Sequence, residues 1–274
     1  MKKIITLFSF AAVLAGCKNE NNKEKEMETE PNELAETATM DQEPDTTFVD
    51  IEPISHATAV FHWGDDVFYT DPVGGAEAFA EAETPDFVLI TDIHSDHMDA
   101  KTLQALELDS VQIIVPKAVK EQLPSEMSDQ LIVMNNGETI EHMGYTITAI
   151  PMYNLPESED AMHVKGRGNG YVLEKNGKRL YISGDTEDTP EMRKLENIDV
   201  ALVSMNLPYT MPVDQAADGV LAFAPKKVYP YHYRGQDGLA DVDKFKQLVN
   251  QKNKDIEVVL LDWYPEMSKS GQDQ

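Results

Sequence analysis

The pattern of apolar and polar positions changes twice along the chain of 274 residues. A short basic head and an apolar run open the chain, and a segment follows that is rich in Glu, Asn, Thr and Pro and has few large apolar residues. Beyond residue 48, short apolar runs alternate with polar segments, which is typical of a domain with a buried core. The pattern predicts a leader at residues 1–17, a disordered acidic tether at residues 18–47 and one folded domain at residues 48–274.

Short apolar runs bounded by turn residues indicate strands in the domain. Residues 57–63 and 67–70 flank Gly64 and Asp65, which predicts a hairpin. Residues 87–91 form a continuous apolar run of the kind that is buried on both faces of a sheet. Further strands are predicted at residues 112–115, 130–133, 145–150, 170–174, 179–183, 200–203, 227–231 and 257–261.

Helices fit between several of these strands. Pro190 and Pro212 stand where proline is favoured, in the first turn of a helix. Strands interspersed with helices indicate a layered α/β fold, and no internal repeat or second linker divides the domain. The predicted helices are residues 99–107, 117–122, 190–195, 212–223 and 241–251.

The leader ends in Val-Leu-Ala-Gly-Cys at residues 13–17, which resembles a bacterial lipobox. This resemblance implies cleavage before Cys17 and attachment of lipid to its thiol. The apolar run is too short to span a bilayer, whereas several acyl chains, at about 0.8 kcal/mol per buried methylene, would hold the protein on a membrane. We expect a lipoprotein of the bacterial cell envelope, anchored to the outer membrane and either periplasmic or surface-exposed; a plain signal peptide with a chance cysteine is the alternative.

Charge and cysteine content narrow the chemistry. The chain has 23 Lys and Arg against 49 Asp and Glu, a net charge of −26, which argues against nucleic-acid binding through a basic surface. A single Cys excludes an intramolecular disulfide and any Cys-rich metal site. Catalysis must therefore use His, carboxylate or hydroxyl groups.

The segment directly after the apolar run at residues 87–91 carries four side chains able to bind metal. Alternate residues of an extended segment share a face, so Asp92 and His94 can converge on one point, while Asp96 and His97 can reach a second point nearby. Two such points with nitrogen and oxygen ligands describe a two-metal site. The alternative, a helix cap in which Asp96 accepts backbone N–H groups, does not explain two His and two Asp together.

This segment resembles the HxHxDH signature of the metallo-β-lactamase superfamily, with Asp92 in place of the first His. Other elements occur in the order of the family: His56 before a hairpin that ends at Asp71, His163 before a second hairpin, Asp185 in Gly-Asp-Thr, and His232 at the end of a strand. The resemblance covers about residues 50 to 263 and is greater to the lactonase and phospholipase D-like branch than to true β-lactamases. It implies a four-layer αβ/βα sandwich.

The resemblance also implies a ligand set. One divalent ion would be held by Asp92, His94 and His163, and a second by Asp96, His97 and His232, with Asp185 between them. A metal-bridging hydroxide would be the nucleophile, and Asp96 or Asp185 would accept and relay the proton. Zinc is favoured, and the anionic oxygen of Asp92 makes manganese or iron the alternatives.

The expected activity is hydrolysis of an ester, lactone or phosphodiester in a small-molecule substrate. The alternative is a non-catalytic metal-binding or sensing lipoprotein that keeps the fold. Asp92, in place of the first His of the motif, would then be a sign that catalysis has been lost. A serine esterase is not supported, because the chain contains no GxSxG motif.

Several residues near the expected ligands have two interpretations. His56 lines the site or makes a hydrogen bond that supports it, and Asp71 supports the metal loop. Asn206 and Tyr209 belong to a loop that contacts substrate or merely connects a strand to a helix. The remaining residues of this kind are Arg167, Tyr233 and Arg234, which bind an anionic leaving group or form salt bridges, and His62 and His142, which we expect to be ordinary surface or edge residues.

Overall fold

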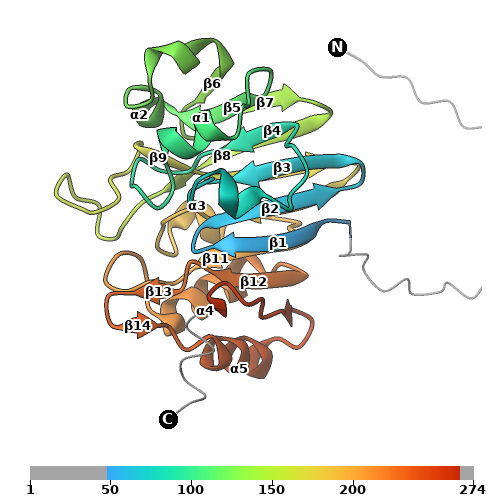
Figure 1. Ribbon diagram of the computed structural model, residues 1–274. Helices are drawn as coiled ribbons and strands as arrows, with labels where there is room; N and C mark the ends of the chain where they lie inside the picture. The colour runs from blue at the N-terminus through green and yellow to red at the C-terminus, as the bar shows by residue number, and fades with distance from the viewer. Residues whose placement is uncertain (1–47, 266–274) are drawn as a thin grey trace, which may run out of the picture. The chain divides into compact units, whose positions relative to one another are not determined.

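Two β-sheets face each other in the computed structural model, which describes residues 48–265 (Figure 1). The first sheet has six strands in their chain order. β1 to β3 are antiparallel, and β3 to β6 run parallel to one another. The strands are β1 (Asp50–Ser55), β2 (Thr58–Trp63), β3 (Asp66–Thr70), β4 (Phe87–Leu89), β5 (Gln112–Pro116) and β6 (Leu131–Met134).

The second sheet has seven strands in the order β15-β12-β11-β10-β9-β8-β7. Its first half along the chain is an antiparallel meander, and its second half is parallel. The strands are β7 (Thr139–His142), β8 (Tyr145–Met152), β9 (Gly168–Lys175), β10 (Lys178–Ile182), β11 (Val200–Ser204), β12 (Lys227–Tyr231) and β15 (Glu257–Val258); β13 (Arg234–Gly235) and β14 (Gly238–Leu239) pair only with each other.

Helices follow the strands of both sheets. No helix within residues 48–265 is long and apolar enough to cross a membrane. The α-helices are α1 (Ala100–Ala105), α2 (Lys117–Lys120), α3 (Pro190–Arg193), α4 (Val213–Phe223) and α5 (Val242–Lys252), and the 3₁₀ helices are η1 (Ala76–Phe79) and η2 (Ser125–Gln130).

Side chains that point alternately to the two faces of β2 and β3 explain the layers of the fold. Phe61 and Phe68 point to one face and stack with ring centroids 4.7 Å apart in the core shared by the two sheets. Val60 and Val67 belong to a second core with Leu103 of α1, on the other face of the first sheet. The main core also includes buried side chains of α4 and α5. Alternate strand positions therefore bury both faces of the sheet, and the predicted four-layer αβ/βα sandwich is confirmed.

The structure corrects some predicted boundaries. The strand predicted at residues 257–261 is limited to Glu257–Val258, and β1 and β7 were not predicted as separate strands. Pro212 precedes α4 as its N-cap residue instead of lying in the first turn, whereas Pro190 is the first residue of α3 as predicted. The predicted leader and tether lie outside the described residues.

Candidate metal centre

The loop from Asp92 to His97 connects β4 to α1. The N-cap of α1 is Asp99, whose side chain accepts a hydrogen bond of 3.0 Å from the backbone N–H of Lys101. The interpretation of Asp96 as the helix cap is therefore wrong. The loop leaves Asp96 and its neighbours free to face residues from the second sheet.

Asp92, His94 and His163 form the first cluster of possible metal ligands. Asp92 Oδ2 lies 2.6 Å from His94 Nδ1 and 3.8 Å from His163 Nε2. Asp92 and His163 are buried, and His94 is partly exposed. This is the trio predicted for the first ion.

His97, Asp185 and His232 form a second cluster, and all three are buried. The Nε2 atoms of His97 and His232 are 3.1 Å apart, and each lies 3.3 Å from an oxygen of Asp185. Asp185 Oδ2 also lies 3.2 Å from His163 Nε2. Asp185 thus contacts residues of both predicted ion positions, as expected of a bridging residue.

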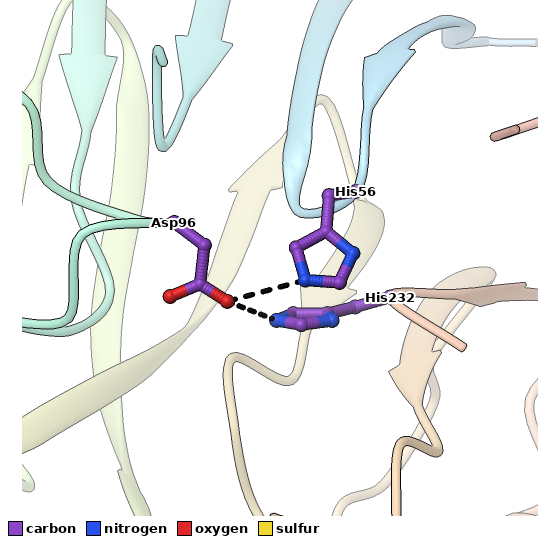
Figure 2. Close-up of side chains that lie close together, drawn as sticks. All are labelled: His56, Asp96 and His232. Carbon is purple, nitrogen blue, oxygen red and sulfur yellow. Dashed lines mark ion pairs between the residues drawn. The ribbon is translucent and has the colours of Figure 1, made fainter. Parts of the chain in front are cut away.

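Asp96 belongs to a third cluster with His56 and His232, shown in Figure 2. Asp96 Oδ2 lies 3.2 Å from His56 Nε2 and 3.4 Å from His232 Nε2. His56 comes from the turn between β1 and β2, and His232 directly follows β12. His56 therefore lies at the site and contacts Asp96, which is compatible with both of its interpretations.

Asp71 supports the loop from Asp92 to His97 through hydrogen bonds, which is the role predicted for it. It follows β3, is fully buried, and accepts hydrogen bonds from the backbone N–H and the hydroxyl of Thr91 at 2.7 and 2.6 Å. Its Oδ2 lies 2.8 Å from His97 Nδ1. A proton on Nδ1 leaves the lone pair of Nε2 directed at the cluster, which is the orientation that a metal ligand needs.

Backbone carbonyls and amides orient the other His residues. His163 Nδ1 lies 3.2 Å from the carbonyl oxygen of Tyr209, and the backbone N–H of His163 donates to Asn154 Oδ1 at 2.8 Å. The side-chain amide of Asn206 lies 3.1 Å from His232 Nδ1. The loop with Asn206 and Tyr209 thus supports the cluster. Asn154 was not among the residues predicted for the site.

Charge within the cluster shifts several pKa values. Burial raises the pKa of the Asp185 carboxyl, but His232 and His97 outweigh burial and hold that pKa well below its usual range. Burial lowers the pKa of His97, but Asp185 and Asp71 raise it well above its ordinary value. Burial raises the pKa of the Asp96 carboxyl, but hydrogen bonds with His232 and His56 outweigh burial and lower that pKa. Without metal, a proton on His97 therefore offsets part of the negative charge of Asp185 and Asp71.

A cavity of about 490 Å³ opens onto the three clusters. Arg234 lines it, whereas Tyr233 is buried, with its hydroxyl 3.4 Å from the carbonyl oxygen of Leu261. His62 lies on β2 and His142 ends the edge strand β7, and neither lines this cavity. The cavity lining is His56, His94, Ser95, Asp96, Met162, His163, Asp185, Asn206, Tyr209, Arg234 and Gly235.

The donor set fits divalent metal. Asp92 Oδ1, His163 Nε2 and Asp185 Oδ1 are buried and have no hydrogen-bond partner within residues 48–265. Buried polar atoms without hydrogen-bond partners are costly, and cations held at the two clusters to which these atoms belong would offset that cost. Imidazole nitrogens with carboxylate oxygens suit zinc, iron or manganese.

Comparison with known proteins finds relatives that are named as metal-dependent hydrolases. Residues 67–233 match the family model of the beta-lactamase superfamily domain. A metal-dependent hydrolase of the UPF0173 family from Thermococcus onnurineus is 30% identical over 207 residues, which are 72% of this chain and 87% of that protein. Residues 1–17 match the prokaryotic membrane lipoprotein lipid attachment site, which indicates membrane anchoring in the cell envelope.

Solved structures show the same fold. A protein from Parabacteroides distasonis, described as a metal-dependent hydrolase, has a TM-score of 0.69 and 34% identity, covering 79% of this chain and 94% of that one. A metallo hydrolase from Ignicoccus hospitalis has a TM-score of 0.65 at 24% identity, covering 78% and 94% of the two chains. The chain belongs to the beta-lactamase superfamily and, within it, to the UPF0173 metal-dependent hydrolases.

Proposed function

We propose that the protein is a lipid-anchored hydrolase with two divalent metal ions that cleaves an ester, lactone or phosphodiester. The observation that carries the proposal is the position of Asp185, whose two oxygens lie within 3.3 Å of His97, His163 and His232. A carboxylate so placed can bridge two ions. Zinc is the ion that we favour, with manganese and iron as alternatives.

The proposed ligands divide between two ions. Asp92, His94 and His163 would hold the first ion. Asp96, His97 and His232 would hold the second, and Asp185 would touch both. When bound, such ions supply Lewis acidity and a water of lowered pKa.

The residues of the chain supply the rest of the chemistry. Asp96 lies in the cavity lining and is 40% exposed, so its carboxylate can accept a proton from an attacking water and pass it to a leaving group. His56 would hold that carboxylate in place through its 3.2 Å contact. Asn206 and Tyr209, also in the lining, would border the substrate.

A leader and tether complete the proposal. Residues 1–17 would direct export and lipid attachment at Cys17, and residues 18–47 would connect the anchor to the domain at residues 48–274. We propose that the anchor lies in the outer membrane. The substrate is accordingly a small molecule outside the cytoplasm.

Elemental analysis of the purified protein, followed by assays on chromogenic esters, lactones and phosphodiesters, tests the function. Asp185→Asn should lower both metal content and turnover by at least about a hundredfold. Asp218→Asn, an exposed carboxylate on α4 that pairs with Lys252, is the matched control and should change neither. Full activity of Asp185→Asn with normal metal content would refute the assignment.

The ion pair between Arg167 and Asp92 favours a second candidate, a non-catalytic metal-binding or sensing lipoprotein. Arg167 Nε lies 3.4 Å from Asp92 Oδ1, where an ion of the first cluster would also bind. One tightly held ion per chain, without turnover of any compound in the panel, would favour this candidate.

A further inference from the structure

Arg234 lies in the wall of the cavity that opens onto the candidate metal centre. It is two positions beyond His232, on the short strand β13. Its backbone N–H donates to the Tyr264 hydroxyl at 3.2 Å, and its guanidinium carbon lies 5.4 Å from the centre of the Tyr264 ring. Contacts to backbone and ring hold the cation at one place in the wall.

The guanidinium of Arg234 has no carboxylate within ion-pair distance in the part of the chain from 48 to 265. The other arginines in this part do: Arg167 pairs with Asp92, Arg179 with Glu174 and Arg193 with Asp188. In a chain with a net charge of −26, an arginine without an acidic partner is unexpected. Its planar set of N–H donors remains available to a ligand.

A second cavity, of about 340 Å³, adjoins the first and shares Arg234 with it. His56, Ser95 and Asp96 also line both. The other residues of the second cavity are uncharged: Ile54, Ser55, Thr58, Val73, Gly74 and Ala78. Arg234 is therefore the one basic side chain, apart from His, in the lining of either cavity within the described residues.

We propose that Arg234 binds an anionic group of the substrate, a carboxylate or a phosphate, that is remote from the bond attacked at the metal centre. The inference rests on the proposed hydrolytic function and narrows its substrate class to acidic compounds. Asp96 and Asp185, the carboxylates of the first cavity, are occupied by His, so they do not compete for the guanidinium. A bidentate contact between a guanidinium and an oxyanion would orient the substrate.

Two chromogenic esters of the same chain length test the proposal with metal-loaded protein: the mono-p-nitrophenyl ester of glutarate, which carries a free carboxylate, and p-nitrophenyl pentanoate, which does not. Arg234→Gln should lower kcat/KM for the anionic ester by about tenfold and leave the neutral ester within about twofold. Arg193→Gln, the same change on α3 outside both cavities, should alter neither rate. Competition by acetate and by methylphosphonate distinguishes the two anions, since the preferred one should lose more potency in Arg234→Gln.

Equal rates for both esters in wild type, or an equal fall for both in Arg234→Gln, would overturn the anion site and leave the hydrolytic function intact. If neither ester is cleaved, calorimetric titration of monomethyl glutarate decides the question independently of turnover. Binding that weakens about tenfold in Arg234→Gln supports the site even if the hydrolytic function fails. Binding that is absent in wild type, or unchanged in the variant, refutes the site.

Discussion

Arg167 lies against both oxygens of the Asp92 carboxylate: Nε is 3.4 Å from Oδ1, and Nη2 donates to Oδ2 at 3.4 Å. Nη2 also donates to the carbonyl oxygen of Met162 at 2.5 Å, which holds the guanidinium over the cluster. Asp92 stands where the superfamily motif has its first His. In this chain an anionic ligand and a cationic partner thus occur together, so a metal ion at the first cluster must compete with Arg167 for the carboxylate.

Arg167→Met should strengthen metal binding at the cluster of Asp92, His94 and His163, because it frees the Asp92 carboxylate. We expect about a tenfold gain in zinc affinity for the weaker of the two proposed sites, measured by calorimetric titration of the metal-depleted protein. Arg179→Met removes an arginine that pairs with Glu174 and is the matched control. Weaker binding in Arg167→Met would show that the arginine positions Asp92 for the ion.

Asp71→Asn should weaken metal binding without removing a ligand. The neutral amide would no longer stabilise a proton on His97 Nδ1, so the ring would lose its fixed orientation. Loss of such a supporting carboxylate costs about 10- to 100-fold in metal affinity. Asp66→Asn, at the other end of β3, should leave the affinity unchanged; equal losses in both variants would indicate a general effect on folding.

The metal-depleted protein should lose stability as the pH rises above neutrality. Asp185 and Asp71 raise the pKa of His97 well above its ordinary value of 6.5, against the effect of burial. The resulting stabilisation is complete below pH 6.5 and disappears as the pH rises through the folded-state pKa. Thermal unfolding between pH 6 and 9 should show a falling Tm.

His97→Gln should flatten this dependence of Tm on pH, and His62→Gln on β2 should keep it. The opposite behaviour applies at acid pH, because the pKa of Asp185 is lowered: its stabilisation is present above its ordinary value of 3.8 and is lost as the pH falls. A Tm that rises from pH 6 to pH 9 in wild type would contradict the expected charge state of His97.

Gly184→Ala should destabilise the fold more than an alanine at another left-handed glycine. Gly184 has a φ of +62°, and a Cβ there would lie 2.5 Å from Met152 Sδ and 3.2 Å from Thr91 Cβ. Gly177, in the β9–β10 turn, has a φ of +71° with open space around it. Both variants place a Cβ on a left-handed backbone and are strained, but only Gly184→Ala adds steric overlap. We therefore expect Gly184→Ala to lose about 2 kcal/mol more of the free energy of unfolding, measured by urea denaturation. Equal losses would mean that Met152 moves aside freely.

Local spacing accounts for what could be predicted from the sequence. Asp92 to His97 follow a strand within six positions, so their convergence follows from backbone geometry. The convergence of His163, Asp185 and His232 was predicted from the order of elements in a known family, since spacing alone does not specify contacts between distant strands. Asn154 was not predicted, because a single amide in a loop has no periodic signal, and the choice of Arg167 as the partner of Asp92 required the folded loop.

The hydroxyl of Tyr264 lies 2.7 Å from His56 Nδ1, which joins residues 208 positions apart. The turn between β1 and β2 therefore meets the last part of the described chain at His56, whose Nε2 lies 3.2 Å from Asp96 Oδ2. Contacts of such separation form late in folding, because a long loop must close first. A partly synthesised chain that ends before Tyr264 therefore contains every candidate metal ligand up to His232 but lacks the hydroxyl that contacts His56.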